Sequence, residues 1–255
     1  MTLRTKSIVA VFGNTESGRF PLAMDMGRAI SQCGQILLTG GTGASGLPLK
    51  VVAMVKEQAI LGADSARSTG CVAPWIGVDR SGVVGSLTDR GGEAFLVQTD
   101  LDHRRNCLEA CLCDAAVALE GKEGTTSEAV FCLSLGKPVV FVGNVWNKYG
   151  IGSSNGSVNF TLMVADAFGR VGKVPQADAP LDVMFNQSAV LAQLSAAATY
   201  RWFPEPSTPA EVLALATNAL QWLQGSVSTS PPGDFPDIPR YRAVIDSYNA
   251  WVVTV

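Results

Sequence analysis

Short apolar runs alternate with amphipathic stretches along the first 143 residues of the chain. The runs lie at residues 7–12, 35–39, 70–76, 94–98, 115–120 and 137–143. Helical spacing of apolar positions occurs between them, at residues 21–33, 47–61, 103–113 and 126–135. Because the runs are continuous rather than alternating, we expect strands that are buried on both faces. The pattern predicts an α/β fold, a Rossmann-like three-layer sandwich with a mostly parallel central sheet.

The regular alternation of predicted strands and helices ends after residue 143. Helical patterns are expected near residues 159–168, 183–197 and 207–223, with a strand at 199–203. The last of these helices has a marked start, in which Ser207 or Thr208 can be the N-cap, Pro209 suits the first helical position and Glu211 lies in the first turn. We therefore expect this helix to be capped by its own side chains.

The end of the chain has two different compositions. Residues 225–238 are rich in Ser, Pro and Gly, as linkers are, whereas residues 239–253 are apolar and aromatic for a terminal segment. We predict one Rossmann-like domain over residues 1–224, with insertions near 77–92 and 144–198. A linker and a docking segment over 225–255 would follow, packing on its own domain or on a second subunit.

The amino-acid composition and net charge exclude some classes of partner and location. The 255 residues are 47% apolar and 16% charged, which is typical of a globular protein, and the net charge of −3 comes without a basic cluster. Nucleic acid and anionic membranes are therefore not expected as partners. The apolar run near the N-terminus is too short for a signal peptide and no run could span a membrane, so we expect a cytoplasmic location. Most of the 6 cysteines lie in apolar segments and are expected to be buried thiols rather than disulfides.

A glycine cluster follows the second predicted strand, in "LLTGGTGASGLP". It contains a literal GxGxxG made of Gly41, Gly43 and Gly46, beside Gly40 and Thr42. Such a loop lets the backbone approach a phosphate, which is the favoured interpretation; the alternative is a turn that needs positive φ for its geometry alone. A dinucleotide fingerprint would follow the first strand instead. Gly13 and Asn14, in "VFGNTESG" after the first strand, are further candidates, because the carboxyl ends of parallel strands meet at one edge.

Two adjacent arginines, Arg104 and Arg105, lie where a helix is expected to begin. Positive charge at a helix N-terminus opposes the helix dipole, so an anionic ligand is one reason for their presence. The alternative is a salt bridge to Asp100, Asp102 or Glu109 on a solvated face.

The stretch "LEGKEGTTSEAV" also allows two interpretations. Thr125 and Glu128 have the spacing of a capping box, which would explain the glutamate by helix capping alone. A loop rich in Gly and Thr at a helix N-terminus is equally a phosphate cradle, which here would use Gly121, Gly124 and Thr126.

No metal site is expected. His103 is the only histidine, and Cys107, Cys111 and Cys113 lack the paired spacing of a zinc site.

Taken together, "LLTGGTGASGLP", "HRRNCLEACLCDAAVALEGKEGTTSEAVFCLSLGKPVVFVG" and "STPAEVLALA" resemble the Lonely Guy (LOG) family, once labelled lysine decarboxylases. The resemblance spans about residues 7–143 and 199–223. It implies a Rossmann-like fold that forms a homodimer or a higher homo-oligomer. It also implies hydrolysis of the N-glycosidic bond of a nucleoside 5′-monophosphate, without a cofactor.

The resemblance assigns roles residue by residue. Arg105 and Glu128 would be the catalytic pair, and Asn106 would follow the family arginine. The remaining ligand-binding positions would be Gly40, Gly41, Gly46, Gly121, Gly124 and Thr125. The loop departs from the family pattern because Glu120 stands at a proline position and Lys122 at a glycine position. Lysine does not readily adopt positive φ, so either the loop takes another path or Lys122 is recruited to the ligand.

Three functions follow from these observations. The first is a nucleotide phosphoribohydrolase that releases free base and ribose 5-phosphate. The second is a binding or carrier protein for a nucleotide or a pterin such as the molybdenum cofactor, which the altered loop favours. The third is a sensor or nucleosidase for NAD or ADP-ribose. All three take a small-molecule ligand.

Overall fold

A central sheet organises the computed structural model, which describes residues 6–13, 20–40, 59–60, 75–79, 85–89, 94–99, 101–153, 157–171, 185–227 and 238–254. The sheet has eight strands in these residues, in the order β4-β5-β3-β2-β1-β6-β7-β8. Their bounds are β1 Ile8–Phe12, β2 Ile36–Thr39, β3 Trp75–Asp79, β4 Gly85–Asp89, β5 Ala94–Gln98, β6 Ala115–Ala118, β7 Val139–Val142 and β8 Tyr200–Phe203. Every neighbouring pair is parallel except β4 and β5.

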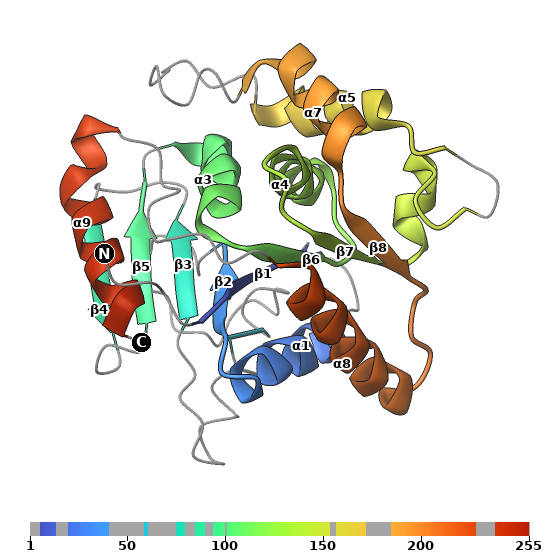
Figure 1. Ribbon diagram of the computed structural model, residues 1–255, viewed down its shortest axis with the longest axis horizontal. Coiled ribbons are helices and arrows are strands. Elements are labelled where there is room, and N and C mark those ends of the chain that lie inside the picture. The colour runs from blue at the N-terminus through green and yellow to red at the C-terminus, as the bar shows by residue number, and fades with distance from the viewer. Residues whose placement is uncertain are drawn as a thin grey trace.

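Helices cover both faces of the sheet (Figure 1). Their bounds are α1 Phe20–Gln32, α3 Arg105–Leu112, α4 Glu123–Ser134, α5 Phe160–Val171, α7 Gln187–Ala197, α8 Pro209–Ser226 and α9 Arg242–Thr254. Short 3₁₀ helices are η3 Asp102–Arg104, η4 Asn144–Tyr149 and η6 Pro239–Tyr241. Helices α1 and α8 lie on one face and α3 and α4 on the other, with α5 and α7 outside α4. The predicted Rossmann-like three-layer sandwich is confirmed.

Two apolar cores explain the continuous apolar runs. Along β1, Ile8, Ala10 and Phe12 belong to the core beneath α3 and α4, whereas Val9 and Val11 belong to the core beneath α1 and α8. Successive side chains of a strand point to opposite faces, so a strand between two helical layers needs apolar residues at every position.

Helix α4 is buried on all sides because α5 and α7 add a further layer over it. The Phe131 ring lies 5.7 Å from the Phe168 ring and 5.5 Å from the Phe185 ring, measured between centroids. A helix covered in this way is apolar all round, as the buried run "AVFCL" at residues 129–133 shows.

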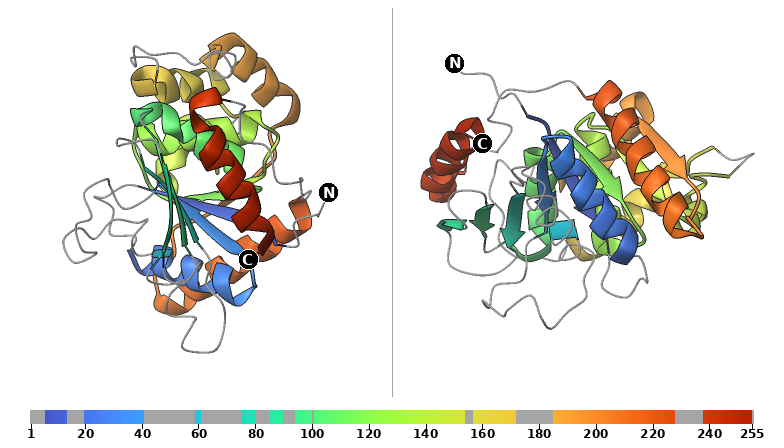
Figure 2. Two further views of the ribbon diagram at one scale, coloured as in Figure 1. Left: turned by 90° about the vertical axis from the view of Figure 1, so that its left-hand side faces the viewer. Right: turned by 90° about the horizontal axis from the view of Figure 1, so that it is seen from below.

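The closing helix α9 lies beside β4 and β5 (Figure 2). The Phe95 ring of β5 lies 5.5 Å from Trp251 and 5.8 Å from Tyr248, and the Tyr248 hydroxyl donates to the carbonyl of Leu112 at 3.4 Å. The apolar and aromatic residues of the closing segment therefore pack on this same chain. Among the helices of the described ranges, none is both long and apolar enough to cross a bilayer.

Two strands of the structure differ from the prediction. Strand β3 runs over 75–79 rather than 70–76, and β4 was not predicted at all. The sequence of β4, "GSLTD", holds a single apolar residue, so it gives no apolar run. It is the antiparallel edge strand, which has only one neighbour to pair with. Most of the helix predicted at 47–61 lies outside the described residues.

Candidate functional site

The chain crosses from one side of β1 to the other at the centre of the sheet. Strand β1 lies between β2 and β6. The chain passes from β1 through α1 to β2 on one side, and later returns through α3 to β6 on the other side. Open α/β sheets bind ligands at such a switch point, outside the carboxyl ends of the strands. Gly13, Gly40 and the loop 119–122 follow the ends of β1, β2 and β6 at this edge.

Arg105 is the first residue of α3, and its guanidinium reaches the end of β2. A Cβ added to Gly40 would lie 2.8 Å from Nη1 and 3.2 Å from Nη2 of Arg105. The missing side chain of Gly40 therefore makes room for this guanidinium. The structure brings together these two residues, which the sequence had placed in separate motifs.

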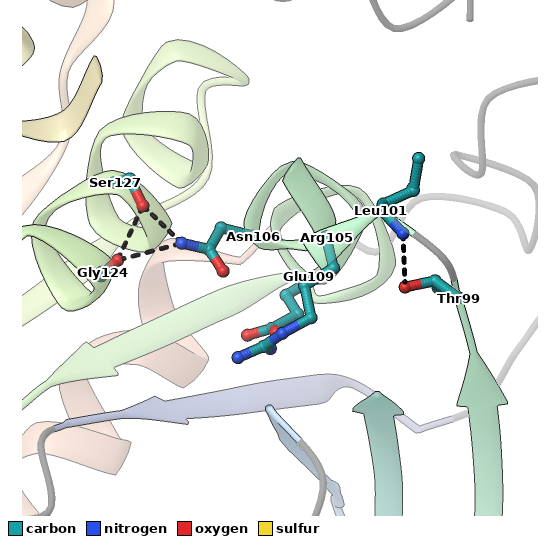
Figure 3. A network of polar contacts seen from close by, with 7 residues as sticks. All are labelled: Thr99, Leu101, Arg105, Asn106, Glu109, Gly124 and Ser127. Carbon is teal, nitrogen blue, oxygen red and sulfur yellow. Dashed lines mark hydrogen bonds and ion pairs between the residues drawn. The ribbon is translucent and has the colours of Figure 1, made fainter. Parts of the chain in front are cut away.

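Arg105 forms an ion pair with Glu109, one turn along α3 (Figure 3). The Glu109 side chain is fully buried and that of Arg105 is 12% exposed. Glu109 was one of three acidic partners considered for the arginines, but the prediction that the pair lies on a solvated face is wrong. The i,i+4 spacing is visible in the sequence, whereas burial depends on the sheet beneath.

Asn106 joins α3 to the start of α4. Its Nδ2 donates to the carbonyl of Gly124 at 3.3 Å and to Oγ of Ser127 at 2.5 Å, and Ser127 Oγ donates to the same carbonyl at 2.7 Å (Figure 3). Both side chains are buried. Sequence reasoning missed Ser127, because in the sequence it looks like the neighbouring hydroxyl residues. Only its contact with Asn106 of α3 distinguishes it.

Helix α4 starts three residues earlier than a capping box between Thr125 and Glu128 would allow. Its first residue is Glu123 and its N-cap is Lys122, with φ −97° and ψ −156° and no side-chain capping hydrogen bond. Thr125 is the third residue of the helix, so the predicted capping box between Thr125 and Glu128 is wrong. Lys122 has extended backbone, and the positive φ that seemed to make lysine unsuitable does not occur.

Gly121 is needed for the side chain of Thr125. A Cβ on Gly121 would overlap Oγ1 and Cβ of Thr125, whereas a Cβ on Gly124 would have nothing within 4 Å. Glu128 follows Thr125 by three residues, so both lie on one face of α4. Thr125 is 5% exposed and Glu128 8% exposed. The helix start therefore carries a nearly buried hydroxyl and carboxylate on the same face.

Thr126 connects the first turn of α4 to the segment after β7. Its Oγ1 donates to the carbonyl of Lys122 at 3.1 Å and lies 3.3 Å from the hydroxyl of Tyr149, which donates to Oδ2 of Asp166 at 2.7 Å. Lys148 Nζ lies 4.5 Å from the Tyr149 ring centroid and 3.2 Å from the same carboxylate oxygen. Burial raises the pKa of the Tyr149 hydroxyl. Sequence reasoning missed these residues of η4 and α5, because they lie in the predicted insertion.

Arg104 packs elsewhere than predicted. Its guanidinium lies over the Phe185 ring, 4.7 Å from the centroid, and the residue is 8% exposed. The prediction that Arg104 lies on a solvated face is therefore wrong. The aromatic ring comes from the segment before α7, which the sequence could not place beside α3.

The described cysteines are free thiols. Cys33 is exposed, and the other four are buried. Burial raises the pKa of the Cys132 thiol, and Sγ of Cys113 lies 3.6 Å away from it. The buried thiols therefore act as small apolar side chains. Within the described ranges, no cluster of three His, Cys, Asp or Glu residues could hold a metal ion.

Several predicted ligand residues lie outside the described residues. They are Asn14, Gly41, Thr42, Gly43 and Gly46.

Comparison with known proteins identifies the family of this chain. A family model described as the SLOG cluster4 family matches residues 6–167, and no curated protein matches the chain. Among solved structures, the molybdenum cofactor binding protein of Rippkaea orientalis is 20% identical with a TM-score of 0.46, covering 84% of this chain and 98% of that one. The molybdenum cofactor carrier protein of Chlamydomonas reinhardtii is 26% identical with a TM-score of 0.41, covering 54% of this chain and 76% of that one. The predicted LOG-like relationship is confirmed, and the chain belongs to the SLOG cluster 4 family.

Proposed function

We propose that this protein binds a nucleoside 5′-monophosphate, or a close analogue, and hydrolyses its N-glycosidic bond to a free base and ribose 5-phosphate. The observation that carries the proposal is the clamp made by Asn106. It holds the helix of Arg105 against the first turn of α4, at the switch point of the sheet.

The start of α4 is the proposed phosphate site. The first N–H groups of a helix have no partner within the helix, and the helix dipole attracts an anion to them. The N-cap side chain of Lys122 does not cap this helix, and the space beside Gly124 is open. A phosphate would therefore act as the cap, with Thr125 supplying a hydroxyl and exposed Lys122 supplying charge. The Thr126 hydroxyl already donates to the Lys122 carbonyl and would instead hold the loop in place.

Glu128 and Arg105 are the proposed catalytic pair. Breaking an N-glycosidic bond builds positive charge on the ribose ring, which a nearby carboxylate stabilises. The same carboxylate can orient the attacking water. Glu128 suits this role because it lies one turn below the proposed phosphate site and is only 8% exposed, where its charge is weakly screened. Arg105 would contact the ribose or the departing base.

Incubation with a panel of nucleoside monophosphates tests this proposal. We expect release of ribose 5-phosphate from at least one of them, and a loss of at least about 100-fold in rate for Glu128→Gln. Asp246→Asn removes an exposed carboxylate on α9 and is the matched control, expected to keep the wild-type rate. No release from any nucleotide by the folded protein would contradict the catalytic proposal.

A carrier without turnover is the second candidate, and one observation favours it. Arg105 already has an internal carboxylate partner in Glu109, so it is less available for chemistry. A pterin such as the molybdenum cofactor also carries a phosphate, which the start of α4 would hold. Retention of such a ligand through gel filtration without turnover would support a carrier, whereas turnover of any nucleotide would contradict it. The predicted homodimer or higher homo-oligomer stays a prediction for either function.

A further inference from the structure

Arg105 already contacts a carboxylate of this chain, that of Glu109, unlike an arginine in an empty anion-binding site. The two charges of this pair are in contact, and Glu109 is 0% exposed. In a poorly solvated setting such a pair interacts strongly and acts as one nearly neutral unit. Residue type alone suggests a positive centre at Arg105, but the structure places a compensating charge directly against it.

Asn106, the residue after Arg105 in α3, adds a buried hydrogen-bond acceptor beside this pair. Asn106 uses its Nδ2 on α4, and its Oδ1 has no hydrogen-bond partner among the described residues although Asn106 is only 1% exposed. In Figure 3 this oxygen points away from α4, to the side where the side chains of Arg105 and Glu109 lie. An anion would add further acceptors here. A hydroxyl can accept from Arg105 and donate to Asn106.

The start of α4 offers the opposite chemistry. It presents backbone donors and the positive end of a helix dipole, next to the exposed side chain of Lys122. Because Asn106 bonds to Gly124 and Ser127, the two settings adjoin but differ in charge.

We propose that Glu109 determines the charge specificity of this site. By cancelling the charge of Arg105, it confines anion binding to the start of α4 and leaves Arg105 to contact an uncharged, hydroxyl-bearing part of the ligand. This inference rests on the proposed nucleotide binding and adds to it the division of the ligand between the two helix starts. Glu109 touches Arg105 rather than the ligand, so it is a positioning residue.

Calorimetric titration with inorganic phosphate and with AMP tests the role of Glu109. Glu109→Gln keeps the shape of the side chain and removes the negative charge that lies against Arg105. We expect this variant to bind inorganic phosphate about 10-fold tighter than the wild type, with a steeper loss of affinity as salt is added. Asp246→Asn removes an exposed charge on α9 and should leave both quantities unchanged.

Unchanged or weaker phosphate binding by folded Glu109→Gln would overturn the inference. An equal gain in Asp246→Asn would also overturn it, because net charge alone would then explain the effect. Glu109→Met, which removes the charge without burying an amide, gives the same test if Glu109→Gln does not fold.

The double variant Arg105→Gln/Glu109→Gln replaces the pair with two neutral amides. Phosphate affinity within about twofold of the wild type is expected, whereas a loss of about 10-fold would show that Arg105 holds the phosphate and would overturn the inference. A wild-type protein that binds neither phosphate nor AMP would contradict the proposed function itself. A wild-type protein that binds both, with no change in Glu109→Gln, would contradict only the role of Glu109.

Discussion

Helices α8 and α4 begin with the same Thr-x-x-Glu spacing, yet only α8 is capped by it. In α8, Thr208 Oγ1 accepts from the N–H of Glu211 at 3.3 Å, and Oε2 of Glu211 accepts from the N–H of Thr208 at 3.2 Å. In α4, Thr125 lies inside the helix, and the side chain of the N-cap residue makes no capping hydrogen bond. The motif alone therefore does not decide whether a capping box forms.

The surroundings of the two threonines account for the difference. Thr208 is exposed and follows an extended segment, so its side chain can turn back to its own helix. Thr125 is 5% exposed and packs on Gly121, in the tight loop after β6. Thus side chains of α8 accept hydrogen bonds from N–H groups at its own start. Under the proposed function, a ligand would accept from the first N–H groups of α4.

Replacing Gly121 should have the largest effect on this comparison. In Gly121→Ala the new methyl group would overlap Thr125, so the start of α4 must shift. We expect a loss of about 2 kcal/mol in the free energy of unfolding, measured by urea denaturation, together with loss of phosphate binding. The control is Gly124→Ala, which has open space and a helical position and should gain up to about 1 kcal/mol. Equal losses in both variants would show that packing on Thr125 is unimportant.

Removing each threonine should separate capping from ligand binding. Thr208→Ala deletes a cap and is expected to cost about 1 kcal/mol of stability with no change in the affinity for AMP. Thr125→Ala deletes no cap, and we expect it to weaken AMP binding about 10-fold through loss of a hydroxyl donor. Denaturation and titration of both variants measure the two quantities. The comparison would be wrong if Thr208→Ala weakened AMP binding as strongly as Thr125→Ala.

The fold could be predicted from the sequence because burial on both faces leaves a signal at every strand position. The bounds of β5 follow from the run "AFLVQ", and β1 differs from its prediction by one residue. The start of α8 was also predictable, since a capping box needs only residues near in sequence. Strand β4 gave no such signal, because an edge strand with one apolar residue resembles a loop.

Sequence reasoning named residues that lie at one edge of the sheet, but not how they pair there. Arg105, Asn106 and Thr125 do gather at one edge, because parallel strands end together. The burial of the Arg105–Glu109 pair depends on the sheet and on Gly40, about 65 residues earlier in the sequence. Helix-cap rules carry no information on such distant neighbours, which is why the local prediction failed at α4.

Removing the Tyr149 hydroxyl should have the smallest effect and would sharpen the comparison, because this hydroxyl supports the first turn of α4 from another element, whereas the cap of α8 comes from its own residues. Tyr149→Phe loses the contacts with Thr126 and Asp166, and we expect a cost of about 1 kcal/mol in the free energy of unfolding at neutral pH.

The effect of Tyr149→Phe should depend on pH. Burial raises the pKa of the Tyr149 hydroxyl in the folded state, so at high pH the hydroxyl ionises more readily in the unfolded state. The hydroxyl therefore stabilises the wild type below the unfolded-state pKa of about 10, and this contribution declines as the pH rises above it. Urea denaturation at pH 7 and pH 11 should show a smaller difference between wild type and variant at pH 11. If the difference in unfolding free energy between wild type and variant grew with pH instead, the folded state would favour the ionised hydroxyl, which would contradict the prediction.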